Sequence, residues 1–167
     1  YSTGYWARNG RNREKDVEAV RNYQHINNPY YVEFVDLLEK MIALKNELGL
    51  TLKIYTHPLE RNWFNEHGIK PPFWDLALEN NIAIDLSGEN SLQQLHEVKI
   101  GIGSMSTILL DRWHHDLASL IFYNNQEKNT FYQPKFFGHY STHFFYHLDE
   151  LKPLVIERLM VDGKLYS

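Results

Sequence analysis

The stretch VKIGIGSMSTILLDRWHHDLASLIFY, residues 98–123, decides the fold that we predict for this chain. It begins with an apolar run over 98–102, which has the length of a short buried strand. The small and hydroxylated residues of 103–107 follow, and they are typical of a turn into a helix. Apolar side chains from 108 onward belong to that helix, and 118–123 is a second apolar strand. The order strand, helix, strand predicts two parallel strands joined by a helical crossover.

The rest of the chain continues this alternation. Further strands are predicted at 52–55 and at 82–86, and the first of them is ended by the proline of Thr56-His57-Pro58. Helices are predicted where apolar residues recur at three- and four-residue steps, or where proline and glycine mark an end, and these segments are 31–48, 73–80, 92–97 and 148–160. The sequence therefore predicts an α/β fold of three layers, with helices on both faces of a mainly parallel sheet.

The length of 167 residues is that of one ordinary domain, and we predict a single domain over 29–167. Residues 1–28 are polar, and we interpret them as an exposed N-terminal arm or linker. The aromatic segment 131–147 fits no regular element, and we expect it to be core or an interface with a partner domain rather than a platform for a sugar or a base. Because the chain begins at Tyr1, we expect it to be a piece of a longer protein.

Composition excludes several classes of function. The net charge is −4, and the 17 basic residues are scattered along the chain, which argues against a nucleic-acid-binding protein. No apolar run has the length of a membrane-spanning helix. The absence of cysteine excludes disulfides, Cys-ligated zinc and a thiol nucleophile. These features are compatible with a cytoplasmic protein or one at the membrane surface.

Ligands of open parallel sheets bind beyond the carboxyl ends of the strands, which here are His57, Ser87 and Gly103. In the segment Gly103 to Thr107, backbone N–H groups at a helix start stand beside the hydroxyls of Ser104 and Ser106, an arrangement suited to a phosphate or a carboxylate. The alternative is that one of these serines only caps the helix.

His57-Pro58 is the second candidate, because an imidazole at a strand end can hydrogen-bond to a phosphate. Its alternative is an ordinary loop histidine. Both candidates lie at strand ends of the predicted sheet, so they converge on one crevice if the two strands are close together.

Two segments carry a resemblance to a known family. Residues 52–61, LKIYTHPLER, and 100–110, IGIGSMSTILL, resemble the nucleotide-binding half of GT-B glycosyltransferases. They are most similar to bacterial sialyltransferases and polysialyltransferases and to related capsule and surface-polysaccharide transferases, which share a His-Pro motif and a later Ser-Ser/Thr motif. The resemblance covers roughly residues 50–123 and implies a Rossmann-like domain.

The resemblance also implies roles for particular residues. His57 would contact the phosphate of a nucleotide-activated sugar and assist departure of the nucleotide, while Ser106 and Thr107 would bind the same phosphate or the base and ribose. No cofactor or metal would be required, and a CMP- or UDP-sugar would be the donor substrate. We further expect the loop residue Glu89 to hydrogen-bond the ribose hydroxyls.

The sequence also departs from that family. These transferases carry an acidic motif in an N-terminal Rossmann-like domain, where a carboxylate acts as general base on the glycan acceptor, and nothing in this chain corresponds to it. We therefore expect this chain to be the donor-binding half of the enzyme, to need that missing domain as its partner, and to be inactive alone.

Three other interpretations remain as alternatives. His139, His143 and His147 recur every four residues and would align as metal ligands on a helix, but Gly138 argues against a helix there. A receiver-like or other non-catalytic partner-binding module would use the same scaffold, although Asp85 lies inside its predicted strand. A nucleotide-sugar epimerase would need carboxylates where these strand ends carry hydroxyls and one histidine.

Overall fold

The computed structural model describes residues 1–2, 13–22, 28–71, 73–88, 91–104, 106–123, 142–161 and 164–165. These residues form two compact units, one consisting of Ser2–Gly88 and the other of Tyr1 with residues 89–167.

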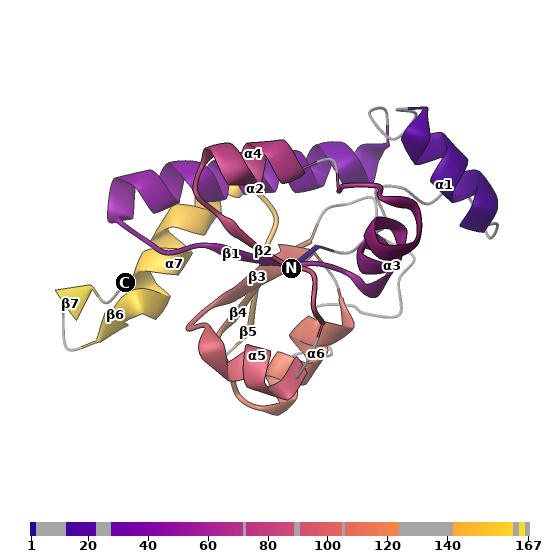
Figure 1. Ribbon diagram of the computed structural model, residues 1–167. Coiled ribbons are helices and arrows are strands. Elements are labelled where there is room, and N and C mark those ends of the chain that lie inside the picture. The colour runs from indigo at the N-terminus through magenta and orange to yellow at the C-terminus, as the bar shows by residue number, and fades with distance from the viewer. Residues whose placement is uncertain are drawn as a thin grey trace. The chain divides into compact units, whose positions relative to one another are not determined.

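In the unit Ser2–Gly88, helices lie along one side and at the end of a short parallel pair of strands (Figure 1). Strand β1 (Lys53–Tyr55) pairs in parallel with β2 (Ala83–Asp85), with Ile54 opposite Ile84. The helices of this unit are α1 (Arg13–Arg21), α2 (Pro29–Leu48), α3 (Pro58–His67) and α4 (Trp74–Glu79). Because α3 and α4 lie between the two strands in the chain, they form the crossover that a parallel pair requires.

Two apolar clusters hold this unit together. The larger cluster joins α2, β1, α4 and β2, and its buried members are Leu38, Ile42, Ile54, Phe73, Ala77 and Ile82. The second cluster packs Val17 and Val20 of α1 against Trp63 of α3. Burial of apolar surface is the main force that fixes these helices, since each contributes apolar side chains to one of the two clusters.

The other unit contains three parallel strands in the order β3-β4-β5. They are β3 (Gly101–Ser104), β4 (Ser119–Phe122) and β5 (Thr142–Phe145). All four residues of the central strand β4 are buried. The other elements are helix α5 (Ser91–Glu97), helix α6 (Thr107–His114), the 3-10 turn η5 (Leu148–Glu150), helix α7 (Leu151–Leu159), and the antiparallel pair β6 (Met160–Val161) and β7 (Lys164–Leu165).

The α/β class with mainly parallel, Rossmann-like strand and helix order is confirmed. Four strands lie at or next to the predicted segments, although β3 begins and ends later than the predicted 98–102. The sequence predicts an exposed arm over 1–28, whereas Arg13–Arg21 is helical and buries Val17, Ala19 and Val20. Helix α3 and strand β5 were not predicted, and the part of the aromatic segment before residue 142 lies outside the described residues.

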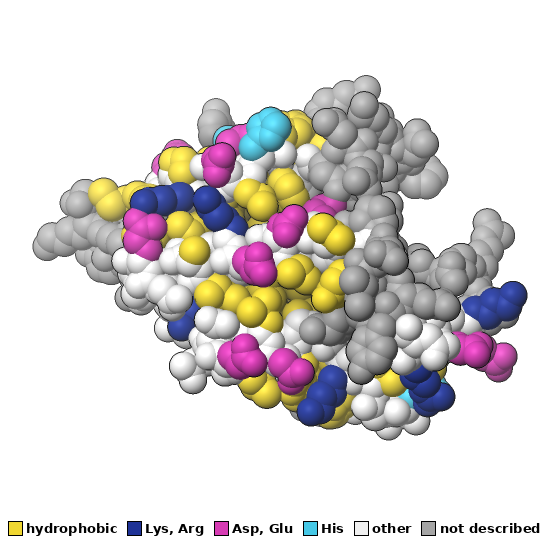
Figure 2. Space-filling model, turned by 90° about the horizontal axis from the view of Figure 1, so that it is seen from above, with side chains coloured by type: hydrophobic (Ala, Val, Ile, Leu, Met, Phe, Trp, Pro, Cys, Tyr) yellow, Lys and Arg dark blue, Asp and Glu magenta, His cyan; other side chains and the backbone are white. Residues whose placement is uncertain are grey.

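Among the helices of the described residues, none is both long and apolar enough to span a membrane. On the face seen from above, acidic, basic and hydrophobic side chains are interspersed (Figure 2). Basic side chains do not dominate this face, which gives no support to binding of a nucleic-acid backbone there.

Candidate functional site

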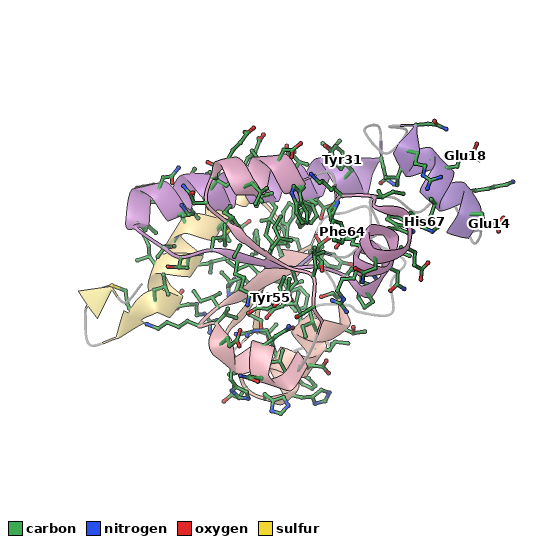
Figure 3. The ribbon with its side chains drawn as sticks, viewed as in Figure 1. Glu14, Glu18, Tyr31, Tyr55, Phe64 and His67 are labelled. Carbon is green, nitrogen blue, oxygen red and sulfur yellow. The ribbon has the colours of Figure 1, made fainter. Side chains whose placement is uncertain are left out.

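The carboxyl end of β1 leads directly into helix α3. His57 comes between the last residue of β1, Tyr55, and the first residue of α3 in the chain. Tyr55 on β1 and Phe64 and His67 on α3 are labelled in Figure 3. His57 is the N-cap of α3, and Pro58 occupies the first helical turn. The Nδ1 atom of His57 accepts a hydrogen bond from the backbone N–H of Leu59 at 3.1 Å. The imidazole therefore accepts the capping hydrogen bond that a serine or aspartate side chain accepts in most N-caps.

Glu60 completes this capping arrangement from inside the helix. Its Oε2 accepts the backbone N–H of His57 at 2.7 Å, and its Oε1 accepts the hydroxyl of Ser2 at 2.5 Å. Glu60 is only 1% exposed. Because a buried carboxylate is costly unless it is hydrogen-bonded, these contacts fix the position of the α3 start.

The cap also fixes the tautomer of His57. A ring nitrogen that accepts a hydrogen bond carries no proton, so the proton of the neutral imidazole is on Nε2. The alternative reading of His57 as an ordinary loop residue is wrong, because it is part of a capping box. Its role toward a ligand stays a prediction.

The carboxyl end of β2 lies beside that of β1. Thr56 donates its hydroxyl to the carbonyl oxygen of Asp85 at 2.6 Å. The Asp85 carboxylate accepts the N–H of Ser87 at 2.9 Å and its hydroxyl at 2.8 Å, and it lies 3.3 Å from Nζ of Lys53. Burial acts to raise the pKa of Asp85, but the hydrogen bonds from Ser87 and the charge of Lys53 outweigh it, so that pKa is lowered.

Asp85 is the last residue of β2, not an interior residue of a strand over 82–86. The physical reason is local, since its carboxylate turns back to the N–H of Ser87 and this side-chain turn competes with continued strand pairing. The carboxylate is thus occupied by Ser87 and Lys53 at a strand end.

In the other unit, β3 leads into helix α6. Ser104 is the last residue of β3 and is buried, so it does not stand at the helix start as predicted. Ser106 is the N-cap of α6, with an extended backbone, and Thr107 is the first residue of the helix. The Ser106 side chain makes no capping hydrogen bond, and its Oγ is buried without a hydrogen-bond partner among the described residues. Ser106 therefore occupies the N-cap position but does not form the side-chain cap of the alternative interpretation.

Gly103 has a packing role, and its predicted ligand contact stays a prediction. A Cβ on Gly103 would lie 2.8 Å from the carbonyl oxygen of Tyr1, which is closer than side-chain carbons tolerate. The amino group of Tyr1 donates to the carbonyl of Ile102 at 2.6 Å, which holds Tyr1 against β3. Only glycine fits at position 103 beside this backbone.

The predicted residues fall into two groups. His57 and Pro58 belong to the unit Ser2–Gly88, and Gly103, Ser104, Ser106 and Thr107 belong to the other unit. A single crevice that joins the two groups stays a prediction. Glu89 lies outside the described residues. Arg61, which no local sequence pattern marks as a site residue, lies at the same strand ends as His57, and its Nη1 donates to the carbonyl of Thr56 at 2.6 Å.

The histidine series does not form a helical metal site. His143 lies in strand β5 and is exposed, His147 is the N-cap of η5, and His139 lies outside the described residues. In the described part of the chain, no group of three or more His, Asp or Glu side chains could hold a metal ion.

Comparison of the chain with protein-family models, with curated proteins and with solved structures found no match.

Proposed function

We propose that this chain is the donor nucleotide-sugar-binding part of a glycosyltransferase that builds a surface polysaccharide or a glycolipid. The parallel α/β fold supports this proposal, because such folds bind nucleotides beyond the carboxyl ends of their strands. Two segments with the predicted motifs, LKIYTHPLER and IGIGSMSTILL, each contain a strand that is followed by a helix start. Helix starts of this kind favour the binding of a phosphate, which supports the proposal.

The observation that carries the proposal is the buried hydroxyl of Ser106. A buried polar atom without a hydrogen-bond partner destabilises the fold, so a ligand that forms a hydrogen bond with it would bind favourably. Ser106 stands at the N-terminus of α6, where backbone N–H groups and the helix dipole favour an anion. A phosphate oxygen at this point would accept hydrogen bonds from the hydroxyl and from the first turn of the helix.

His57 would act as a hydrogen-bond donor rather than as an acid. Its Nδ1 is engaged with Leu59, so a second ring proton would have to displace the cap of α3. The neutral ring keeps Nε2–H, which can stabilise charge on a phosphate without being transferred. This is the milder of the two roles that the resemblance implies for His57.

The reaction would be a displacement at the anomeric carbon of the donor sugar. The bond between that carbon and the phosphate oxygen breaks, the electron pair leaves with the nucleotide, and the acceptor oxygen forms the new bond. The proton of the acceptor hydroxyl would go to a general base in the separate N-terminal domain. This chain would supply the hydrogen bonds that stabilise the departing phosphate.

Calorimetric titration of the chain with CMP, UDP and GDP tests the proposal. We expect one of the three to bind, and we expect Ser106→Ala to weaken that binding about tenfold, since a hydrogen bond to a charged group is lost. His57→Asn is the informative change at the other position, because asparagine is a good N-cap and preserves α3 while the imidazole is removed.

Thr142→Val is a matched control for Ser106→Ala. The Oγ1 of Thr142 is also buried without a hydrogen-bond partner among the described residues, but Thr142 is the first residue of β5 and so lies at the amino end of a strand. We expect this variant to bind the nucleotide as the unchanged chain does. Failure of a folded chain to bind any of the three nucleotides would contradict the proposed function.

A further inference from the structure

Arg61 is a half-buried guanidinium held in one place at the carboxyl ends of β1 and β2. Its Nη1 donates to the carbonyl of Thr56, the residue that directly follows β1, at 2.6 Å. Arg61 itself is in the first turn of α3, so its backbone is fixed by the same capping box as His57. The backbone of Arg61 is therefore fixed by α3 and its guanidinium by the Thr56 carbonyl. Both lie at the strand ends, where α/β sheets bind ligands.

Gly88 shapes the surface on which the guanidinium lies. A Cβ built on Gly88 would be 2.5 Å from Cζ of Arg61 and 2.6 Å from both Nε and Nη2. These nearly equal distances mean that the flat face of the guanidinium covers Gly88. The backbone of Gly88 has φ +61°, a conformation that strongly favours glycine. The loop after β2 therefore leaves room for the guanidinium of Arg61.

The charge of Arg61 is not matched by a carboxylate among the described residues. The carboxylate at these strand ends is that of Asp85, and it is paired with Lys53 at 3.3 Å and hydrogen-bonded to Ser87. The other nearby carboxylate, Glu60, is directed to Ser2 and to the backbone N–H of His57. A guanidinium with its face covered presents its remaining N–H groups in its plane, which is the geometry of bidentate recognition of phosphate.

We propose that Arg61 is a phosphate-binding residue and that it holds a phosphate group of the nucleotide at the carboxyl ends of β1 and β2, beside His57. This inference rests on the proposed function for the identity of the nucleotide. Arg61 supplies the full charge and the planar pair of donors that the neutral imidazole of His57 lacks. Lysine at this position keeps the charge but loses the bidentate geometry.

The experiment compares the tightest-binding of CMP, UDP and GDP with its own nucleoside, which lacks the phosphate. In the unchanged chain we expect the nucleotide to bind more tightly than the nucleoside. Arg61→Gln should weaken nucleotide binding about tenfold or more, because charge-assisted hydrogen bonds are lost, while nucleoside binding stays the same. Arg61→Lys should give an intermediate loss. Lys70→Gln, which removes an exposed cation beside Trp74 of the same unit, is the control and should change neither affinity.

Inorganic pyrophosphate separates failure of this inference from failure of the proposed function. If a nucleotide binds and Arg61→Gln and Arg61→Lys both bind it unchanged, the role of Arg61 is overturned while the proposed function stands. If the folded chain binds no nucleotide but binds pyrophosphate in a manner that depends on Arg61, the proposed function falls and the phosphate site stands. If neither pyrophosphate nor any nucleotide binds, both are overturned. Circular dichroism of each variant confirms folding, and Arg61→Lys remains informative should Arg61→Gln fail to fold.

Discussion

Helices α3 and α6 both begin just after a parallel strand, yet their first turns are satisfied in different ways. At the start of α3, His57 caps the helix with its side chain, and the buried Glu60 accepts the N–H of His57. At the start of α6, the hydroxyl of Ser106 is buried and makes no capping bond. Serine, a common N-cap residue, does not cap α6 with its side chain, whereas histidine, an uncommon N-cap residue, caps α3.

The far end of α6 explains how that helix is held without a side-chain cap. Arg112 in its last turn is fully buried and donates to the carbonyls of Leu95 at 2.6 Å and Ala118 at 2.8 Å, with a weaker contact to the hydroxyl of Ser119. Helix α3 is fixed at its start and α6 at its end. The start of α6 is therefore held without a side-chain cap, whereas the start of α3 depends on the side chains of His57 and Glu60.

The largest effect is expected from removing the anchor of α6. Arg112→Met removes a buried guanidinium and leaves several buried carbonyls without a donor, so we expect the free energy of unfolding to fall by about 3 to 5 kcal/mol. Urea denaturation measures this loss. Arg112→Lys keeps the charge with fewer donors and should be intermediate. A loss below 1 kcal/mol for Arg112→Met would show that α6 is held by other contacts.

The next effect concerns the start of α3. Glu60→Ala removes the acceptor for the His57 N–H and for the Ser2 hydroxyl, and we expect a loss of about 2 to 3 kcal/mol in urea denaturation. Glu60→Gln keeps one acceptor oxygen and should lose less. An exposed glutamate in the same helix, Glu66, is the control, and Glu66→Ala should change stability little. Equal losses for the Ala variants at 60 and 66 would contradict the capping role of Glu60.

A smaller difference between the starts of α3 and α6 is expected in how the free energy of unfolding depends on pH. Asp85, the last residue of β2, lies beside the segment before α3 and is paired with Lys53, whereas the segment 101–107 before α6 contains no acidic residue. Because the pKa of Asp85 is lowered in the folded state, its contribution to stability is present above the ordinary pKa of an aspartate and is lost as the pH falls through the lowered value.

Asp85→Asn should therefore destabilise the chain by at most about 1 kcal/mol at pH 7, as is usual for partly exposed ion pairs. The difference between the variant and the unchanged chain should shrink below the ordinary aspartate pKa. Urea denaturation at pH 7 and at pH 3 measures it. A difference that is the same at both pH values would mean that the Lys53 and Ser87 contacts do not stabilise the charged form.

The smallest effect is expected at the start of α6. Ser106→Ala removes a hydroxyl that has no hydrogen-bond partner among the described residues, so the free energy of unfolding should change by no more than about 0.5 kcal/mol or should rise slightly. Thermal denaturation without ligand measures the change. A loss of 1 kcal/mol or more, the value typical of a lost N-cap, would mean that Ser106 caps α6 in solution and would remove the contrast with α3.

The sequence predicted the strands and most of the helices because their signals are local. Apolar runs, three- and four-residue spacing, and proline or glycine at the ends predicted β1, β2 and β4 and five of the helices within a few residues. Helix α3 was missed although Pro58 at the first turn, Glu60 at the third position and Gly68 at the C-cap are its usual signals. Histidine is not among the common N-caps, so His57 was interpreted as the end of a strand and not as the beginning of a helix.

The candidate site was predictable only as a set of positions. His57, Ser106 and Thr107 were identified from the sequence as residues near strand ends, and they lie there. The residues next to each side chain in the sequence do not determine whether it already forms a hydrogen bond within the fold. Arg61 was missed because nothing in the local pattern indicates that its guanidinium lies on Gly88, which is distant in the sequence.

The sequence by itself determined the α/β class, the alternation of strands and helices, and the places where strands end. These depend on propensity, periodicity and turn chemistry, which act over a few residues. Only the tertiary structure decided that Glu60 is buried beneath Ser2, that Gly103 lies against Tyr1, and that the hydroxyl of Ser106 is left without a partner in the described part of the chain. Those outcomes depend on which distant segments exclude water from a given atom, and burial sets the cost of an unpaired polar group.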